Sequence, residues 1–254
     1  MSDPELDAET KMVELLTEAE APEADRFVVD GQRLTPEQVI EILEPVMRAE
    51  RLERIREVVA QRTRTVVPVV EGLVNTGNVS AVMRSAEGMG YQDFHVVKGQ
   101  NERFKHSERT SRGAEKWIDL TRWEAPEPCV DFLHAAGYTV VATHLDDEAV
   151  SIDTIDFTEK TALVFGNEKD GISPAMQEAV DQTCIIPMAG FTESFNISVA
   201  AALGLYHAQR DRLARQGHHA DLSEPEQTRL VARFCMRSVR KPEAILRRAI
   251  ETET

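Results

Sequence analysis

Residues 65–89 read TVVPVVEGLVNTGNVSAVMRSAEGM, and this stretch decides the fold. The β-branched run at 65–70 predicts a buried strand, and the small and apolar residues from Ser80 to Met89 predict a helix. A polar loop with two glycines joins them. A buried strand followed by a loop and a helix is the repeating unit of a parallel sheet.

The same alternation continues along the chain. Short apolar runs predict further strands at 94–97, 117–120, 138–143, 161–165 and 183–186. Helices are predicted at 129–136, from Ser173-Pro174 onward, at 195–216, and after Ser223. We therefore predict an α/β domain over residues 65–216, with a parallel sheet covered by helices on both faces.

Helical extensions are predicted at both ends of this domain. Residues 1–45 form an acidic N-terminal extension with a predicted helix at 10–20 and a helix start at Thr35-Pro36, where Thr is the N-cap and Pro the first helical residue. We interpret this extension as a partly disordered tail or a packing arm. Residues 46–64 are predicted to be a basic helix, and residues 217–254 a C-terminal helical extension.

Composition excludes several classes of protein. The chain has 254 residues, of which 42% are hydrophobic, and it lacks an apolar run of the roughly 20 residues that span a bilayer. Its three cysteines lie far apart, which excludes a disulfide scaffold and a CxxC-type zinc site. The N-terminus has no signal-peptide pattern. We expect a cytoplasmic protein that is not bound to a membrane and that binds no metal ion.

The net charge of −15 is unevenly distributed. Residues 1–45 hold 13 acidic residues against Lys11, Arg26 and Arg33, whereas residues 46–70 hold six arginines against three glutamates. Residues 98–124 and 211–254 each carry an excess of two positive charges. Local basic patches permit RNA binding, although solvated helix faces would give the same pattern.

Three polar loops follow predicted strands, at the ends where parallel sheets bind ligands. They span residues 75–84, 166–173 and 187–198, and none is a GxGxxG fingerprint or a P-loop. Each residue of interest also has a commonplace interpretation: a helix cap, a solvated charge or a turn glycine. These residues are Asn78, Arg84, Gly166, Glu168, Ser194 and Asn196.

Taken together and in this order, the loops resemble the three signature motifs of the SPOUT methyltransferase superfamily, in its branch of tRNA and rRNA ribose 2′-O-methyltransferases. The motifs read NTGNVSAVMRSAEGMG (75–90), LVFGNEKDGIS (163–173) and IPMAGFTESFNISVAAAL (186–203). The resemblance covers roughly residues 50–210. Within the branch, the chain is most similar to the tRNA (guanosine-2′-O-)-methyltransferases that modify guanosine 18 of the D loop. The segment TSRGAEKWIDL (110–120) and Thr143 support that subfamily.

This resemblance implies a fold and a cofactor. The fold is an α/β SPOUT domain with a C-terminal deep trefoil knot, an exception to the rule that chains are not knotted. It also implies a homodimer with the long helix at 195–216 near the interface. S-adenosylmethionine would bind in the knot at Thr143, Gly166, Ile186 and Phe195. Family members often carry Leu at the position of Phe195.

The resemblance also implies the catalytic residues. It assigns the central role to Arg84, with Asn78, Glu168, Ser194 and Asn196 orienting it or the substrate. A guanidinium is a poor general base because it stays protonated at neutral pH. We therefore interpret Arg84 as the group that holds the phosphate and the 2′-oxygen and stabilises the developing negative charge.

The substrate prediction rests on the ends of the chain. Related rRNA enzymes usually carry an α/β domain ahead of the catalytic one, and the short extension at 1–45 favours tRNA instead. Basic helices at 48–64, with Arg51, Arg54 and Arg56, and at 229–248 would grip the RNA. The alternatives are an rRNA 2′-O-methyltransferase, a catalytically silent RNA-binding homologue, and a nucleotide-binding oxidoreductase, which the missing glycine fingerprint disfavours.

Overall fold

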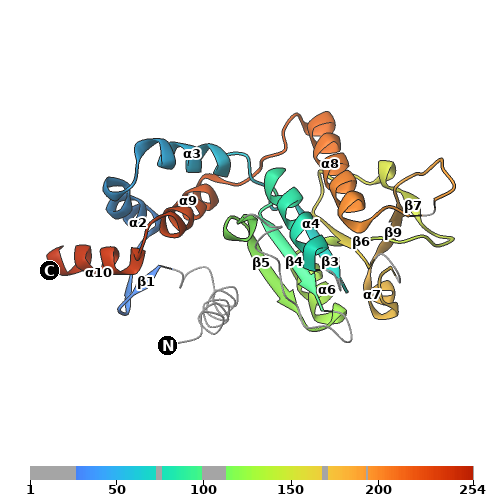
Figure 1. The fold of residues 1–254 in the computed structure, drawn as a ribbon, viewed down its shortest axis with the longest axis horizontal. Helices are drawn as coiled ribbons and strands as arrows, with labels where there is room; N and C mark the ends of the chain where they lie inside the picture. Colours follow the sequence, from blue (N-terminus) through green and yellow to red (C-terminus); the bar gives the residue numbers. More distant parts are fainter. Residues whose placement is uncertain (1–26, 73–75, 99–112, 168–170, 193, 254) are drawn as a thin grey trace. The chain divides into compact units, whose positions relative to one another are not determined.

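The computed structural model describes residues 27–72, 76–98, 113–167, 171–192 and 194–253 (Figure 1). It divides the chain into two compact units. One unit combines Met1–Gln61 with Leu222–Thr254, and the other comprises Arg62–Asp221. The helix predicted at 10–20 lies outside the described residues.

A parallel sheet of seven strands forms the centre of the unit 62–221. The strands are β3 (Val66–Glu71), β4 (Asp93–Val97), β5 (Asp119–Trp123), β6 (Thr139–Thr143), β7 (Val150–Ser151), β8 (Thr161–Phe165) and β9 (Gln182–Ile185). Their order in the sheet is β5-β4-β3-β8-β6-β9-β7. The predicted parallel α/β sheet is confirmed. The prediction missed β7, because two residues are too few to show a period.

Helices cover both faces of this sheet. On one face, α4 (Thr76–Gly88) packs beside α8 (Ile197–Gln216), and Met83 and Leu205 from these helices are fully buried in one core cluster (Figure 1). On the other face, α6 (Pro126–Ala135) and α7 (Pro174–Ala179) bury Leu133 and Met176 in a second cluster. Two 3₁₀ turns, η3 (Ala114–Lys116) and η4 (Ile152–Thr154), complete the described helical segments of this unit.

The strand order contains a topological switch. From β3 the chain steps outward to β4 and β5, and then α6 carries it back to β6 on the opposite side of β3. In open α/β sheets, ligands bind outside the carboxyl ends of the strands at such a switch. The order therefore directs attention to the carboxyl ends of β3, β8, β6 and β9.

The second unit is mainly helical. It contains the hairpin β1 (Val28–Val29) and β2 (Gln32–Arg33), followed by α2 (Pro36–Leu43), η2 (Glu44–Val46), α3 (Ala49–Val59), α9 (Glu224–Ser238) and α10 (Pro242–Glu253). The predicted N-cap at Thr35 is confirmed, because Thr35 and Gln38 form a reciprocal capping box. Val39 and Leu43 of α2 are fully buried, and α2 packs on α9. In the described part of the predicted extension, α2 therefore packs against the C-terminal helices.

The C-terminal basic segment differs from the prediction of one helix over 229–248. It forms α9 and α10, with a break between Ser238 and Pro242. Lys241 has a φ of 56°, in the left-handed region, and the residue before a proline avoids the helical region. The Lys-Pro pair was therefore the signal in the sequence for this break.

Candidate active site

Three of the four predicted cofactor-binding positions meet at one edge of the sheet. Thr143 ends β6 and pairs with Phe165 of β8 on one side and with Cys184 of β9 on the other. Gly166 and Ile186 follow β8 and β9 directly, so both lie beside Thr143. The Thr143 hydroxyl donates a hydrogen bond to the carbonyl of Val164 (3.1 Å), which fixes its side chain against β8.

The loop that leaves β8 is pinched shut by its own backbone. Asn167 and Gly171 exchange two hydrogen bonds between main-chain nitrogen and oxygen atoms, of 2.7 and 2.9 Å. A Cβ atom on Gly166 would lie within 2.5 Å of backbone atoms of Gly171 and Ile172. Only glycine therefore fits at 166, and the reason is backbone approach rather than a positive φ. Glu168, a predicted catalytic residue, lies outside the described residues.

Two side-chain contacts attach this loop to the end of β3. The Asn167 side-chain amide donates to the carbonyl of Gly72 (2.7 Å), and the Ser173 amide and hydroxyl donate to the two carboxylate oxygens of Glu71 (2.9 and 2.5 Å). Burial raises the pKa of Glu71. Our sequence reasoning missed both Glu71 and Asn167. A glutamate that ends an otherwise apolar strand was the available signal for Glu71.

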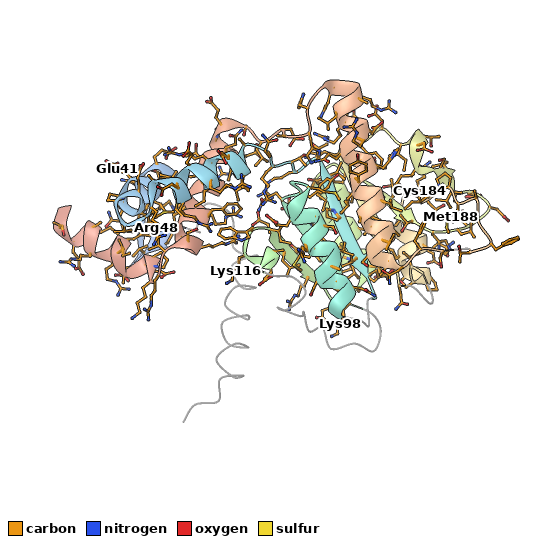
Figure 2. The ribbon with its side chains drawn as sticks, turned by 45° about the horizontal axis from the view of Figure 1, so that its top comes forward. Glu41, Arg48, Lys98, Lys116, Cys184 and Met188 are labelled. Atoms are coloured by element: carbon orange, nitrogen blue, oxygen red, sulfur yellow. The ribbon has the colours of Figure 1, made fainter. Side chains whose placement is uncertain are left out.

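The loop between β9 and α8 carries the remaining third-motif residues. Figure 2 shows Cys184 in the sheet and Met188 in the loop that leaves it. The Asn196 side-chain oxygen caps α8 by accepting from the amide (3.0 Å) and the hydroxyl (2.5 Å) of Ser198. Ser194 is exposed and Phe195 half-buried. Phe191, which sequence reasoning missed, is fully exposed.

The two first-motif residues lie on α4. Asn78 is half-buried in the first turn, and Arg84 is exposed, six residues further on. Side chains six residues apart on a helix point about 120° apart, so Asn78 and Arg84 do not share a face. Arg84 and Asn196 belong to neighbouring helices, because α4 packs beside α8.

The predicted RNA-binding arginines lie in the other unit, on α3. Arg51 donates from two nitrogens to the Ser238 hydroxyl of α9 (3.4 Å each), and Arg54 pairs with Glu57 (3.0 Å). All three arginines are exposed, but at 100° per residue Arg51 and Arg56 flank opposite sides of the buried face and Arg54 points away from it. The structure does not gather them on one face of α3.

Burial holds two thiols and one imidazole of the sheet domain neutral. Burial raises the pKa of the Cys184 thiol and of the Cys129 thiol to about 12, so neither is a ready nucleophile. Burial also lowers the pKa of His95 to about 4, and Nδ1 of His95 accepts a hydrogen bond from the Trp123 indole (2.9 Å). Among the described residues, no group of three or more His, Cys, Asp or Glu side chains could hold a metal ion.

The carboxyl edge of the sheet suits a bound cofactor. The edge offers main-chain groups from three loops and the partly buried side chains of Ile186 and Met188. Backbone and apolar contacts of this kind fit the expected S-adenosylmethionine. No helix in the part of the chain that is described is long and apolar enough to cross a membrane.

Comparisons with known proteins agree with this geometry. The model of the SpoU rRNA methylase family matches residues 65–206. The tRNA (guanosine(18)-2′-O)-methyltransferase of Escherichia coli (strain K12) is 35% identical over 188 residues, which cover 73% of this chain and 82% of that protein.

Solved structures are similar over the same region. The crystal structure of the A. aeolicus TrmH/SpoU tRNA modifying enzyme has a TM-score of 0.69 and 31% identity, and covers 79% of this chain and 100% of its own. The SpoU methyltransferase AviRb from Streptomyces viridochromogenes, in complex with the cofactor AdoMet, has a TM-score of 0.54 and 30% identity. That match covers 66% of this chain and 67% of AviRb.

Proposed function

This chain belongs to the SpoU rRNA methylase family, and on that premise we propose that it transfers a methyl group from S-adenosylmethionine to the ribose 2′-hydroxyl of guanosine 18 in tRNA. The observation that carries the proposal is the strand order β3-β8-β6-β9, which brings the three motif loops to one edge of the sheet. The tRNA substrate is supported by the names of the E. coli and A. aeolicus relatives.

The cofactor site would be built from Thr143, Gly166, Ile186 and Phe195. The pinched backbone at Gly166 and the Thr143 hydrogen bond to β8 support this assignment, because both give the edge a fixed shape. The cofactor supplies an electrophilic methyl group when bound. The protein would have to hold the 2′-oxygen of the ribose in line with this methyl group and to help the 2′-hydroxyl lose its proton.

Arg84 is the residue to which we assign that task. Its exposed guanidinium on α4 would hold the phosphate and the 2′-oxygen of the substrate and stabilise the charge that develops on this oxygen. Asn78, Ser194 and Asn196 would orient the substrate, and Glu168 has the same assignment from its motif alone. Asn196 already caps α8, so it would act through the placement of that helix end as well.

We further propose that the domain holds a trefoil knot in its C-terminal part. Support comes from β9, which lies beyond β6, while α8 returns to pack on α4. The segment before β8 is bonded to α8: Asp211 accepts from the Phe157 amide (3.1 Å) and Arg212 donates to the Phe157 carbonyl (2.8 Å). An experimental structure in which the C-terminal segment does not pass through a loop of the chain would contradict the knot.

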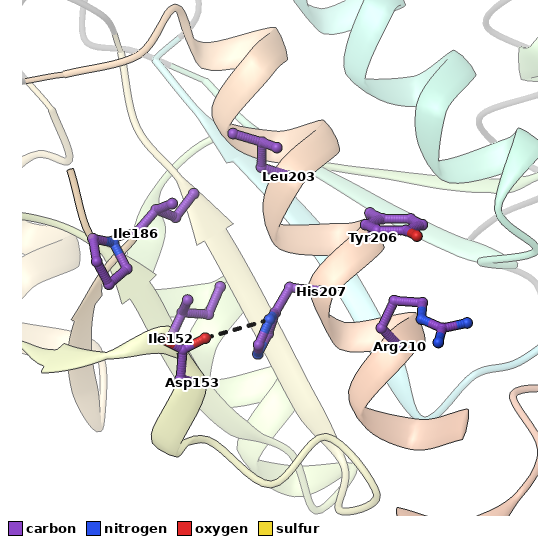
Figure 3. A pocket seen from close by; sticks show the side chains of 8 residues that line it. Ile152, Asp153, Ile186, Leu203, Tyr206, His207 and Arg210 are labelled. Atoms are coloured by element: carbon purple, nitrogen blue, oxygen red, sulfur yellow. Dashed lines mark ion pairs between the residues drawn. The ribbon is translucent and has the colours of Figure 1, made fainter. Parts of the chain in front are cut away.

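A homodimer through α8 is also part of the proposal. Val199, Leu203, Tyr206 and Leu213 recur at helical spacing and are 37–54% exposed, which is unusual for apolar side chains along one helix. Leu203 and Tyr206 line a pocket of about 270 Å³ together with His207 and Arg210 of the same helix (Figure 3). A second copy of the chain would cover this stripe.

The exposed arginines of α3 would bind the phosphate backbone of the RNA. Arg51, Arg54 and Arg56 are exposed, and their spread over several sides of α3 suits contacts to a phosphate backbone that wraps the helix. Replacing all three with Gln should weaken tRNA binding and lower its dependence on salt concentration by up to about three counterions. Unchanged affinity at every salt concentration would remove these residues from the proposal.

The proposed activity is tested by incubating the protein with labelled S-adenosylmethionine and either unmodified tRNA or unmodified rRNA. We expect label in tRNA, and we expect Arg84→Lys to lose most of the turnover, because lysine lacks the planar fork that binds two oxygens at once. Label only in rRNA would show that the substrate is rRNA instead of tRNA. Cofactor binding without transfer to either RNA would favour a silent RNA-binding homologue. The three described cysteines are buried free thiols, which suits the cytoplasmic location we propose.

A further inference from the structure

Glu71 is a buried carboxylate to which the proposed reaction gives no role. It is the last residue of β3, whose other five residues are apolar and fully buried, and it is itself only 4% exposed. An ionised group is expensive to bury, so a carboxylate at this position needs partners. Both of its oxygens have one: Oε2 accepts from the Ser173 amide (2.9 Å) and Oε1 from the Ser173 hydroxyl (2.5 Å).

Ser173 also begins α7, so its contact with Glu71 restrains the start of this helix. Its hydroxyl oxygen also accepts a hydrogen bond from the Met176 amide (3.1 Å), so Ser173 is the N-cap of α7 while its proton points at Glu71. Met176 is fully buried in the core cluster on this face of the sheet. One carboxylate therefore fixes the point at which the second-motif loop enters its helix.

The other end of the same loop is bonded to Gly72, the residue that follows β3. The Asn167 side chain donates to the carbonyl of Gly72, and its backbone closes on Gly171. Glu71 and Gly72 thus hold both ends of the loop that Gly166 begins. These contacts join residues about 100 positions apart in sequence, 102 for Glu71 and Ser173 and 95 for Gly72 and Asn167.

We propose that Glu71 is a positioning residue for cofactor binding: its two hydrogen bonds to Ser173 hold residues 171–173 at the end of β3, beside Gly166, where they would receive S-adenosylmethionine. This inference rests on the proposed function. Among the described residues, the titratable groups that interact with Glu71 are the Glu127 carboxyl and the Cys129 thiol, both from α6. Neither offers a positive charge, so the two Ser173 hydrogen bonds are what hold the carboxylate in place.

The test compares Glu71→Gln with a variant that damages the opposite end of the sheet. Gln keeps the size of the side chain, and its oxygen can still accept from the Ser173 amide. Its NH₂ group can only donate, so the Ser173 hydroxyl loses the charged acceptor of its proton. The control is Asp119→Asn, which weakens the Asp119–Arg64 ion pair (2.6 Å) at the amino end of β5. We expect both variants to lose thermal stability.

Only Glu71→Gln should change the loop and the cofactor site. We expect amide exchange at residues 171–173 to become faster in the absence of cofactor, and the Kd for S-adenosylmethionine to rise at least about tenfold, which is 1.4 kcal/mol. Wild-type exchange rates at residues 171–173 in Glu71→Gln would contradict the proposed role of Glu71. A tenfold weaker Kd in Asp119→Asn as well would contradict it too. A wild-type protein that binds no S-adenosylmethionine would instead overturn the proposed function, a result that the wild-type measurement identifies by itself.

Discussion

Replacing Gly166 with alanine puts the pinched loop under direct strain. The added Cβ would lie within 2.5 Å of backbone atoms of Gly171 and Ile172, whereas carbon atoms normally pack at about 3.5–4 Å. Backbone atoms cannot rotate away as the end of a side chain can. The loop must therefore open by about 1 Å, and the two hydrogen bonds between Asn167 and Gly171 must lengthen.

The size of the effect follows from this geometry. Forcing a methyl group into a packed site costs about 1–3 kcal/mol, so we expect a loss of about 2 kcal/mol. In a domain the size of the unit Arg62–Asp221, each kcal/mol shifts the Tm by about 2–4 °C, which predicts a fall of about 4–8 °C. If cofactor binding must close the loop again, the same 2 kcal/mol weakens S-adenosylmethionine binding by about 30-fold.

Thermal melting and calorimetric titration measure these two quantities. The matched control is Gly190→Ala in the third-motif loop, where the nearest atom to a new Cβ is the Thr192 hydroxyl oxygen at 3.7 Å, an ordinary contact. We expect that variant to melt and bind as the wild type does. The reasoning is refuted if Gly166→Ala has the Tm and the cofactor affinity of the wild type.

Three further predictions concern pH, RNA and assembly. Burial lowers the pKa of His95 to about 4 from its ordinary 6.5, so between these values the unfolded chain binds a proton that the native protein does not. The free energy of unfolding should therefore fall by about 3 kcal/mol as pH drops from 6.5 to 4. Urea melts of His95→Gln at several pH values should show a free energy of unfolding that depends less on pH. Phe191 is fully exposed beside the site, and stacking on a base contributes about 1–3 kcal/mol. Phe191→Ala should raise the KM for tRNA with an unchanged Tm, and Phe191→Trp should restore it; an unchanged KM in the alanine variant would exclude stacking. Leu203→Glu should convert a dimer to monomers in sedimentation experiments, and a wild-type monomer at micromolar concentration would contradict the α8 interface.

Sequence reasoning succeeded where the pattern is local. β-branched runs predicted β3, β6 and β8 to within a residue or two, and the cap at Thr35 is visible within four residues. It failed where the element is shorter than any period, as in the two-residue β7, and where Lys241-Pro242 was passed over as a helix break.

The residues of the candidate site were predicted or missed for the same reason. The three motif loops are contiguous in sequence, so their residues could be named, and the strand order explains why Thr143, Gly166 and Ile186 meet. Glu71 stands out locally as a glutamate at the end of an apolar strand, but its partner Ser173 is 102 residues distant, so no local pattern shows what the carboxylate binds. The arginines of α3 are close in sequence, but helical spacing places them on different sides of the axis, which only the structure displays.

The most direct test of the central claim is the position of the methyl group in the product. A tRNA transcript is methylated with labelled S-adenosylmethionine and digested, and the label is mapped, beside a matched transcript with a 2′-deoxyguanosine at position 18. The account predicts label as 2′-O-methylguanosine at position 18 of the first transcript and none in the second. Equal label in both transcripts, or label on a base instead of a ribose, would contradict it.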